Sequence, residues 1–165
     1  MANRLKGLIN DQEAAYLKLL IVGPDDTAAK NALQRLCKLY RGDQRLRDES
    51  EMRRILLGSL QHPDPKVIRW SLNALAFIAK PEDDKAIINA ISEHRENPDI
   101  LGAGVAALAS LKALDDLRSS LDGIELPLRG AALFAAAQQI RSLEADLRKN
   151  RVDINSDQYG DDVTP

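Results

Sequence analysis

The chain has 165 residues, of which 44% are hydrophobic and 29% are charged, and these proportions exclude a disordered or transmembrane chain. Aromatic residues make up only 4%, and leucine and alanine supply most of the apolar side chains, a bias that favours helix packing over a β-sandwich. The formal net charge of -2 excludes a general electrostatic attraction to nucleic acid or to an anionic membrane.

Two helices are predicted in the first quarter of the chain. Apolar side chains at spacings of three and four predict a helix over residues 4–22, with the stripe Leu5, Leu8, Ile9, Tyr16, Leu19 and Leu20. Gly23-Pro24-Asp25 ends this helix, and Asp25 or Asp26 can cap the next one. The second helix covers residues 26–41, and its predicted core positions are Ala29, Leu33, Leu36 and Leu39.

The middle of the chain repeats this arrangement. After a polar turn over 42–50, a helix over 51–61 is interrupted by His62-Pro63-Asp64-Pro65. The next helix presents one apolar side, formed by Val67, Ser71, Ala74, Leu75 and Ile78, and ends at Lys80-Pro81. Residues 82–95 form a helix with acids in its first turn, as the helix dipole favours.

The last third again contains predicted helices. Asn97-Pro98-Asp99 starts a helix over 99–114, in which Gly102 and Gly104 permit close helix packing. A short helix near 115–121 and a long alanine-rich one over 128–149 follow. Prolines at 24, 63, 98 and 127 each separate the two helices of one hairpin, and such a period indicates an α-solenoid. We therefore predict an all-α repeat domain over 1–149 with about four antiparallel hairpins, and an acidic tail over 150–165.

One segment carries a family likeness. Residues 64–78, DPKVIRWSLNALAFI, resemble a HEAT repeat of the short bacterial kind, with Val67, Ala74-Leu75 and Ile78 at the positions of that pattern. Arg69 lies one place later than the pattern expects, and the other copies keep the proline turn and an Ala-Leu pair, at Ala32-Leu33, Ala107-Leu108 and Ala132-Leu133. The resemblance implies a right-handed α–α superhelix, the HEAT-like solenoid.

The resemblance also implies a function, because most HEAT-like proteins bind other proteins through the surface lined by their second helices, and a few act on bilins or DNA bases. We expect a non-enzymatic adaptor or scaffold that binds a protein partner and needs no cofactor. Self-association through the ends of the solenoid is a further possibility. The alternatives are a nucleic-acid-binding module using residues 1–54, which hold eleven basic and eight acidic side chains, and a bilin-lyase-like protein, which no residue supports.

The predicted partner-binding residues lie on the second helices of the first two hairpins: Asn31, Arg35, Lys38, Arg69, Trp70, Asn73 and Lys80. Trp70 is the only tryptophan, and Trp and Arg are favoured interface anchors. The alternative interpretations are a solvated helix face, and a Trp70 that packs with Phe77 against the neighbouring hairpin.

No catalytic residue and no metal site are predicted. In the tail, four residues match positions 1, 3, 5 and 9 of a calcium loop, Asp153, Asn155, Asp157 and Asp161. Position 6 is Gln158 instead of glycine, and position 12 is Thr164 instead of glutamate, so a solvated acidic tail is preferred.

The expected location is the cytoplasm. The single cysteine, Cys37, cannot form an internal disulfide, and the segment MANRLKGLIND lacks the apolar core of a signal peptide. The apolar run from Leu19 to Val22 is too short to cross a bilayer. We therefore expect no membrane association.

Overall fold

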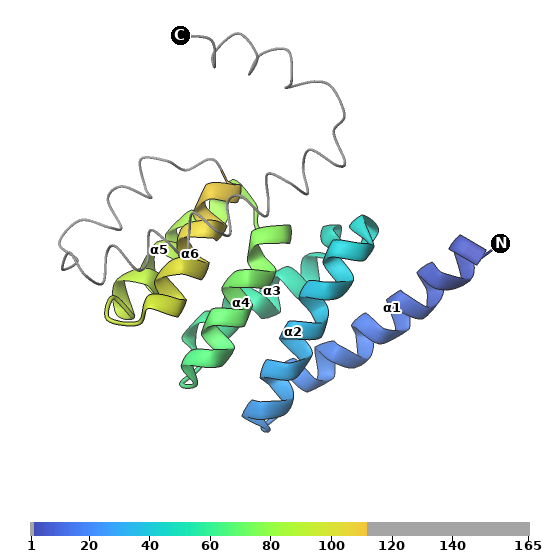
Figure 1. Ribbon diagram of the computed structural model, residues 1–165, viewed down its shortest axis with the longest axis horizontal. Helices are drawn as coiled ribbons and strands as arrows, with labels where there is room; N and C mark the ends of the chain where they lie inside the picture. The colour runs from blue at the N-terminus through green and yellow to red at the C-terminus, as the bar shows by residue number, and fades with distance from the viewer. Residues whose placement is uncertain (1, 112–165) are drawn as a thin grey trace, which may run out of the picture.

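The computed structural model describes residues 2–111, and this part of the chain contains helices and no strand (Figure 1). Its six α-helices are α1 (Ala2–Ile21), α2 (Asp26–Gly42), α3 (Ser50–Gly58), α4 (Pro65–Ile78), α5 (Asp84–Glu93) and α6 (Pro98–Ser110). Three short 3-10 helices lie between them, η1 (Gln44–Asp48), η2 (Ser59–Gln61) and η3 (Pro81–Asp83). The predicted all-α class is confirmed for these residues.

The six helices form three successive hairpins, α1 with α2, α3 with α4 and α5 with α6. The second helices of the hairpins lie side by side, and α4 in the middle contacts both α2 and α6 (Figure 1). The predicted fourth hairpin over 115–149, its Ala132-Leu133 pair and the tail over 150–165 lie outside the described residues.

Each turn between paired helices supplies a side chain that caps the second helix, as predicted at the first of these turns. Asp25, and not Asp26, caps α2, because its Oδ1 accepts a hydrogen bond from the Ala28 N–H at 3.1 Å. Asp64 accepts from the Lys66 N–H at 2.9 Å, and Asn97 caps α6 in the same way. Prolines occupy the first turns of α4 and α6, where the missing N–H has no intrahelical partner. Three of the predicted helix starts are thus fixed by local side chains.

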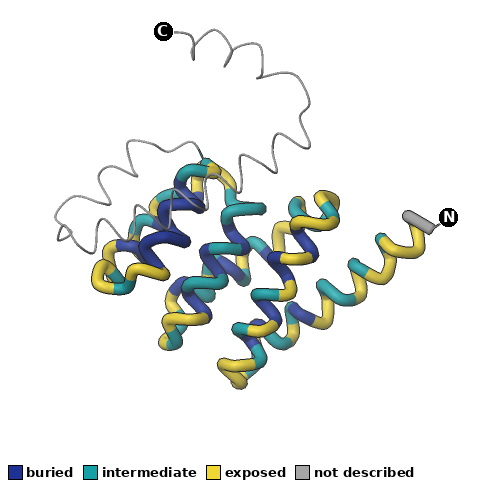
Figure 2. Tube along the Cα trace, viewed as in Figure 1, coloured by how far each residue is buried: buried dark blue, intermediate teal, exposed yellow. Residues whose placement is uncertain are grey.

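The core lies between the hairpins and is densest around α4. Val67, Leu72 and Leu75 of α4 are fully buried between α2 and α6 (Figure 2). In α6, an added Cβ on Gly104 would come within 2.4 Å of Ile91 Cγ1, so the glycine permits the close approach of α5 to α6. The expected packing role is therefore confirmed for Gly104.

The polar turn after α2 contains more structure than the sequence predicts. Residues 44–48 form η1, and Asp43 caps it by accepting a hydrogen bond from the Arg45 N–H at 3.1 Å. The Arg47 guanidinium lies 5.0 Å from the centre of the Phe77 ring, and its Nε donates to the Tyr40 carbonyl at 2.7 Å. The turn thereby packs over the C-terminal ends of α2 and α4.

In helix α1 the buried side differs from the side that the sequence predicts. Five of the six residues of the predicted stripe face outward, whereas the sixth, Leu20, is partly buried against the core beside the buried Leu17 and Ile21. Periodicity predicts a helix, whereas the neighbour that a helix finds decides which face is covered. Within residues 2–111 no helix is both long enough and apolar enough to cross a membrane.

Candidate partner-binding surface

A groove crosses the second helices of all three hairpins. It has a volume of about 260 Å³ and lies where α2, the start of α4 and the start of α6 meet. Its lining, here called the second-helix groove, consists of Lys30, Gln34, Pro65, Lys66, Arg69, Trp70, Asn97 and Asp99. A larger hollow of about 620 Å³ is lined by the single turn 92–98, so it has no second wall to hold a ligand.

Arg69 and Trp70 meet at the centre of the second-helix groove. The Arg69 guanidinium carbon lies 5.2 Å from the centre of the Trp70 ring, within the range of a cation–π contact. Its Nη1 lies 3.7 Å from Asp99 Oδ2 on α6, a loose ion pair that brings the third hairpin to the same site. Two side chains that are enriched at protein interfaces are thus stacked in a concave site.

The other predicted site residues divide into two groups. Asn73 lies half-buried one turn beyond Trp70 on α4, and Asn31 and Lys38 are exposed on α2 beside the groove lining. Arg35 and Lys80 lie elsewhere. Arg35 binds Glu13 of α1 through three hydrogen bonds of 2.7 to 3.1 Å, and Lys80 lies beyond the end of α4, where its N–H donates to Asp83 at 2.7 Å.

Sequence reasoning missed the α2 side of the groove. Lys30 and Gln34 line it, each one position before a predicted residue, Asn31 and Arg35. One residue corresponds to about 100° of rotation on a helix, so an offset of one changes the face. The spacing of four between Lys30 and Gln34, which places them on one helix face, was the available signal.

The groove carries a positive charge. Lys30 and Lys66 form no ion pair with any residue between 2 and 111, and neither does the neighbouring Lys38. Asp99 is the one acidic side chain in the lining, and it faces Arg69. Such a surface favours an acidic ligand over a basic one.

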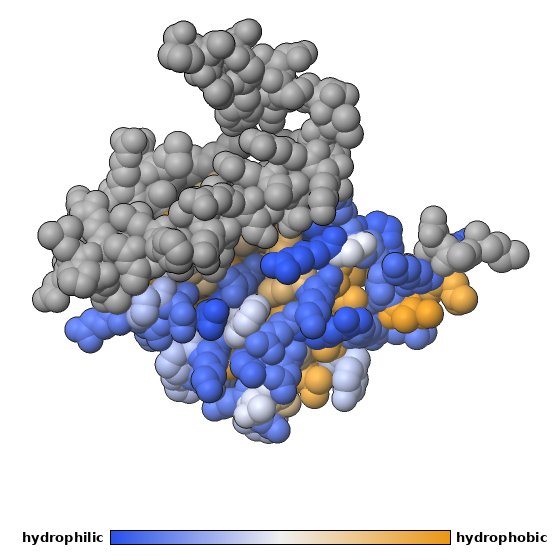
Figure 3. Space-filling model, viewed as in Figure 1, coloured by the Kyte–Doolittle hydropathy of each residue, from blue (hydrophilic) through white to orange (hydrophobic). Residues whose placement is uncertain are grey.

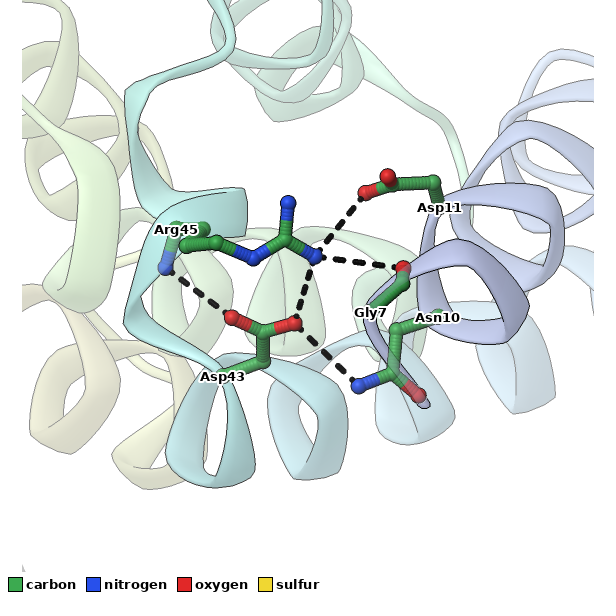
Figure 4. Close-up of polar contacts among 5 residues, drawn as sticks. All are labelled: Gly7, Asn10, Asp11, Asp43 and Arg45. Atoms are coloured by element: carbon green, nitrogen blue, oxygen red, sulfur yellow. Dashed lines mark hydrogen bonds and ion pairs between the residues drawn. The ribbon is translucent and has the colours of Figure 1, made fainter. Parts of the chain in front are cut away.

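Several other basic side chains of the N-terminal half are already paired. Lys18 binds Glu49 and Glu51 at 2.9 and 3.0 Å, and the Arg35 guanidinium lowers the pKa of Glu13 through its hydrogen bonds. Figure 4 shows the Nη2 of Arg45 bound to three oxygens, on Gly7, Asp11 and Asp43, at 2.9 to 3.3 Å.

Asp43 lies at the centre of the contacts in Figure 4. Burial raises its pKa, but the hydrogen bonds donated by the Asn10 amide and by Arg45 lower it by more, so the carboxylate stays ionised. Because the guanidinium and ammonium groups in these clusters are neutralised by carboxylates, the excess of basic residues over 1–54 does not form one free patch. This arrangement reduces the support for a nucleic-acid interface.

Reactive groups and metal ligands do not gather in the described residues. Burial raises the pKa of the Cys37 thiol to about 12, so the thiolate that a nucleophile requires does not form at neutral pH. Residues 2–111 hold no group of three or more His, Cys, Asp and Glu that could bind a metal ion. The calcium-loop-like residues of the tail lie outside this part of the chain.

Comparison with protein-family models, with curated proteins and with solved structures finds no match to this chain.

Proposed function

We propose that the protein is a HEAT-like α-solenoid that acts as a non-enzymatic adaptor, and that its second-helix groove binds an acidic segment of a partner protein. The observation that carries this proposal is the Arg69–Trp70 stack in a groove shared by three helices. Trp and Arg are enriched among the residues that dominate binding energy at interfaces, since Trp buries a large area and the Arg guanidinium offers five hydrogen-bond donors.

The packing of α4 supports the HEAT-like part of the proposal. Val67, Ala74, Leu75 and Ile78, the positions that carry the resemblance, all lie in the core. Ser71, which stands at a usual alanine position, is also fully buried. Lys66, Arg69 and Trp70 of the same helix line the groove, and Trp70 and Phe77 are also partly buried against the core, as the alternative interpretation expects.

Charge supports an acidic ligand. Lys30 and Lys66 lie on opposite walls, from α2 and α4, and both are without an ion-pair partner in residues 2–111. A carboxylate placed between them would gain two contacts at little cost in desolvation, because the groove is open to solvent. We expect the charges to speed association and the aromatic anchor to slow dissociation.

Site-specific photocrosslinking tests the assignment. A photoreactive amino acid at Lys66 should give one discrete protein adduct in cells, whereas the same group at Arg54, exposed on α3, should not. When the photoreactive group at position 66 is combined with Arg69→Glu, the adduct should disappear. When it is combined with Arg54→Glu, a matched charge reversal, the adduct should remain.

Two results would contradict the proposal. Equal crosslinking from Lys66 and Arg54 would mean that the groove has no preference for a partner. An adduct at Lys66 that contains nucleic acid would show that the groove takes a polyanion of a different class. Circular dichroism of both charge-reversal variants shows whether the helices remain intact.

A further inference from the structure

The outward side of α1 is an apolar surface with no cover from any described residue. Five large apolar side chains on it and Val22, the first residue after its end, are between 55 and 68% exposed, the five being Leu5, Leu8, Ile9, Tyr16 and Leu19. They are all the exposed large hydrophobic residues that residues 4–111 contain, and hydrophobic atoms gather on α1 beside the N-terminus in Figure 3. Concentration on one helix distinguishes this surface, called the outer face of α1, from scattered surface leucines.

The inner face of α1 is already occupied. Leu17 and Ile21 pack into the core near its C-terminal end, and polar contacts hold the rest. Asn10, Asp11 and Glu13 bind Asp43, Arg45 and Arg35 respectively, which fixes the rotation of the helix about its axis. The outer face is therefore directed away from the three hairpins by contacts that the protein makes on its own.

The outer face has a repeat of seven residues. Leu5, Gln12 and Leu19 are spaced by seven, and Leu8, Ala15 and Val22 form a second such series three places later. These are the a and d positions of a coiled-coil seam. A single polar residue at an a position, here Gln12, is a feature that sets register and partner number in paired helices.

We propose that the outer face of α1 binds the same face of a second copy of this chain, in a two-fold, antiparallel helix pair. The seam is complementary to itself in that direction. The facing residues are Leu5 with Val22, Leu8 with Leu19 and Gln12 with Ala15, and each pair occurs twice because of the symmetry.

The residues that flank the a and d positions on each side also match their counterparts in the second copy. On one border Ile9 faces Tyr16 of the second copy, so apolar side chains meet. On the other border Asp11 and Lys18 of the two copies face each other, and each already has an ion pair within its own copy, Asp11 with Arg45 and Lys18 with Glu49 and Glu51, so this contact would extend existing networks of opposite charge. A parallel pair would instead place each seam residue beside its own copy, with Gln12 next to Gln12 at the centre, and would set Asp11 opposite Tyr16, which carries no charge.

The charge pattern distinguishes a second copy from a membrane surface. The border of the outer face carries acidic Asp11 beside the basic Arg4 and Lys18, whereas a helix that lies on anionic lipid has a uniformly basic polar face. The central Gln12 would also lie at the deepest point of insertion. The mixture of signs suits a protein surface with matching opposite charges.

The expected dimer is of modest strength. A helix of 20 residues is about 30 Å long, and one pair of such helices lies at the small end of stable interfaces. We therefore expect exchange between monomer and dimer over about 1 to 100 μM, the weak end of the range for interfaces of this kind.

Sedimentation velocity of the full chain over that range is the first test. The mass should rise towards twice that of the monomer, and Leu8→Glu with Leu19→Glu should hold the protein as a monomer throughout. The matched control is Asn89→Glu with Ser92→Glu, which adds the same charge to exposed positions of α5. Because all four positions are exposed in the monomer, the helical circular dichroism signal should stay unchanged.

Engineered cysteines test the direction of the pair. Oxidation of a mixture of Leu5→Cys and Val22→Cys proteins should give a covalent dimer of one of each, while either protein alone should not. The parent chain is the background control, since Cys37 is buried. Crosslinking of each variant with itself would overturn the antiparallel arrangement.

Three further results would overturn the proposal. The first is a protein that stays monomeric up to about 100 μM and whose α1 amide protons exchange slowly with solvent. That result would mean that residues 112–165 cover the outer face of α1. The second is a monomer that binds anionic vesicles through the same leucines. The third is a dimer that survives Leu8→Glu with Leu19→Glu. The proposal concerns α1 alone, so its failure would leave the second-helix groove assignment intact.

Discussion

Arg53 of α3 binds both carboxylate oxygens of Asp83 in η3, with Nε–Oδ2 and Nη2–Oδ1 distances of 2.7 Å. Asp83 also accepts the Lys80 N–H at 2.7 Å, and only 5% of its side chain is exposed. The pair joins the second hairpin to the start of the third. Burial raises the pKa of Asp83, but the hydrogen bonds from Arg53 and from the Lys80 backbone lower it by more, so the net direction is downward.

Asp83→Asn should therefore destabilise the protein in a pH-dependent way. A carboxyl group whose pKa is lowered by folding stabilises the native state above its unfolded pKa, about 3.9, and that contribution is lost as the pH falls through the folded value. At pH 7 the variant should lose about 1.5 to 3 kcal/mol, the range for hydrogen bonds to charged groups. Urea unfolding at pH 7 and near pH 3 measures this, and an equal loss at both pH values would contradict the ion-pair interpretation.

Gly104→Ala should destabilise the α5–α6 hairpin. The added methyl would come within 2.7 Å of both Ile91 Cγ1 and Cδ1, so the isoleucine or the helix must move, at a cost of about 1 to 3 kcal/mol. Gly58→Ala is the control, because nothing lies within 4 Å of an added Cβ at the end of α3. Gly58→Ala should raise the free energy of unfolding by about 0.5 to 1 kcal/mol. Thermal unfolding that ranks the two variants in the opposite order would contradict this packing.

Asp25→Ala should remove the cap of α2. Its carboxylate accepts the Ala28 N–H at 3.1 Å, and loss of such a cap costs about 1 kcal/mol. Asp25→Asn keeps an oxygen acceptor at the same place and should retain most of the stability. If chemical denaturation gave equal losses for the two variants, the side chain would be acting through its charge and not through the cap.

The Cys37 thiol should react only when the protein unfolds. It is buried among α2 core residues, and its pKa is raised to about 12 by that burial. A thiol-specific reagent at pH 8 should modify the native protein at least about a hundredfold more slowly than the protein in denaturant. Rapid native labelling would show that α2 opens locally.

The sequence predicts the hairpins well because their signals are local. Proline turns, Asp and Asn caps and spacings of three and four act within a few residues, so the sequence predicts the starts of α2, α4 and α6 to within a residue or so, whereas α6 ends at Ser110 and not at the predicted residue 114. The sequence does not predict which side of α1 is exposed, because that side is set by contacts such as Arg35 with Glu13, which are 22 positions apart. No sequence pattern indicates such a contact.

The groove was predicted only in part for a similar reason. Arg69 and Trp70 lie in the segment 64–78, where the apolar spacing defines the helix register most clearly. On α2 the resemblance is limited to Ala32-Leu33, and the predicted residues Asn31 and Arg35 lie one position after Lys30 and Gln34, which line the groove. Asp99 and Asn97 reach the groove because α6 packs beside α4, which is a property of the stack and not of any one helix.

The row of second helices has a mechanical consequence. Helix α4 touches both α2 and α6, so in residues 2–111 cohesion passes from one end to the other through the middle hairpin. When the chain is pulled along the direction from α2 to α6, the first or the third hairpin can detach alone. Loss of the α4 core at Leu72 or Leu75 would instead separate the first hairpin from the third. Resistance to pulling therefore resides in the same helix that carries Trp70 of the proposed binding site, and we expect a ligand bound there to stabilise all three hairpins against unfolding.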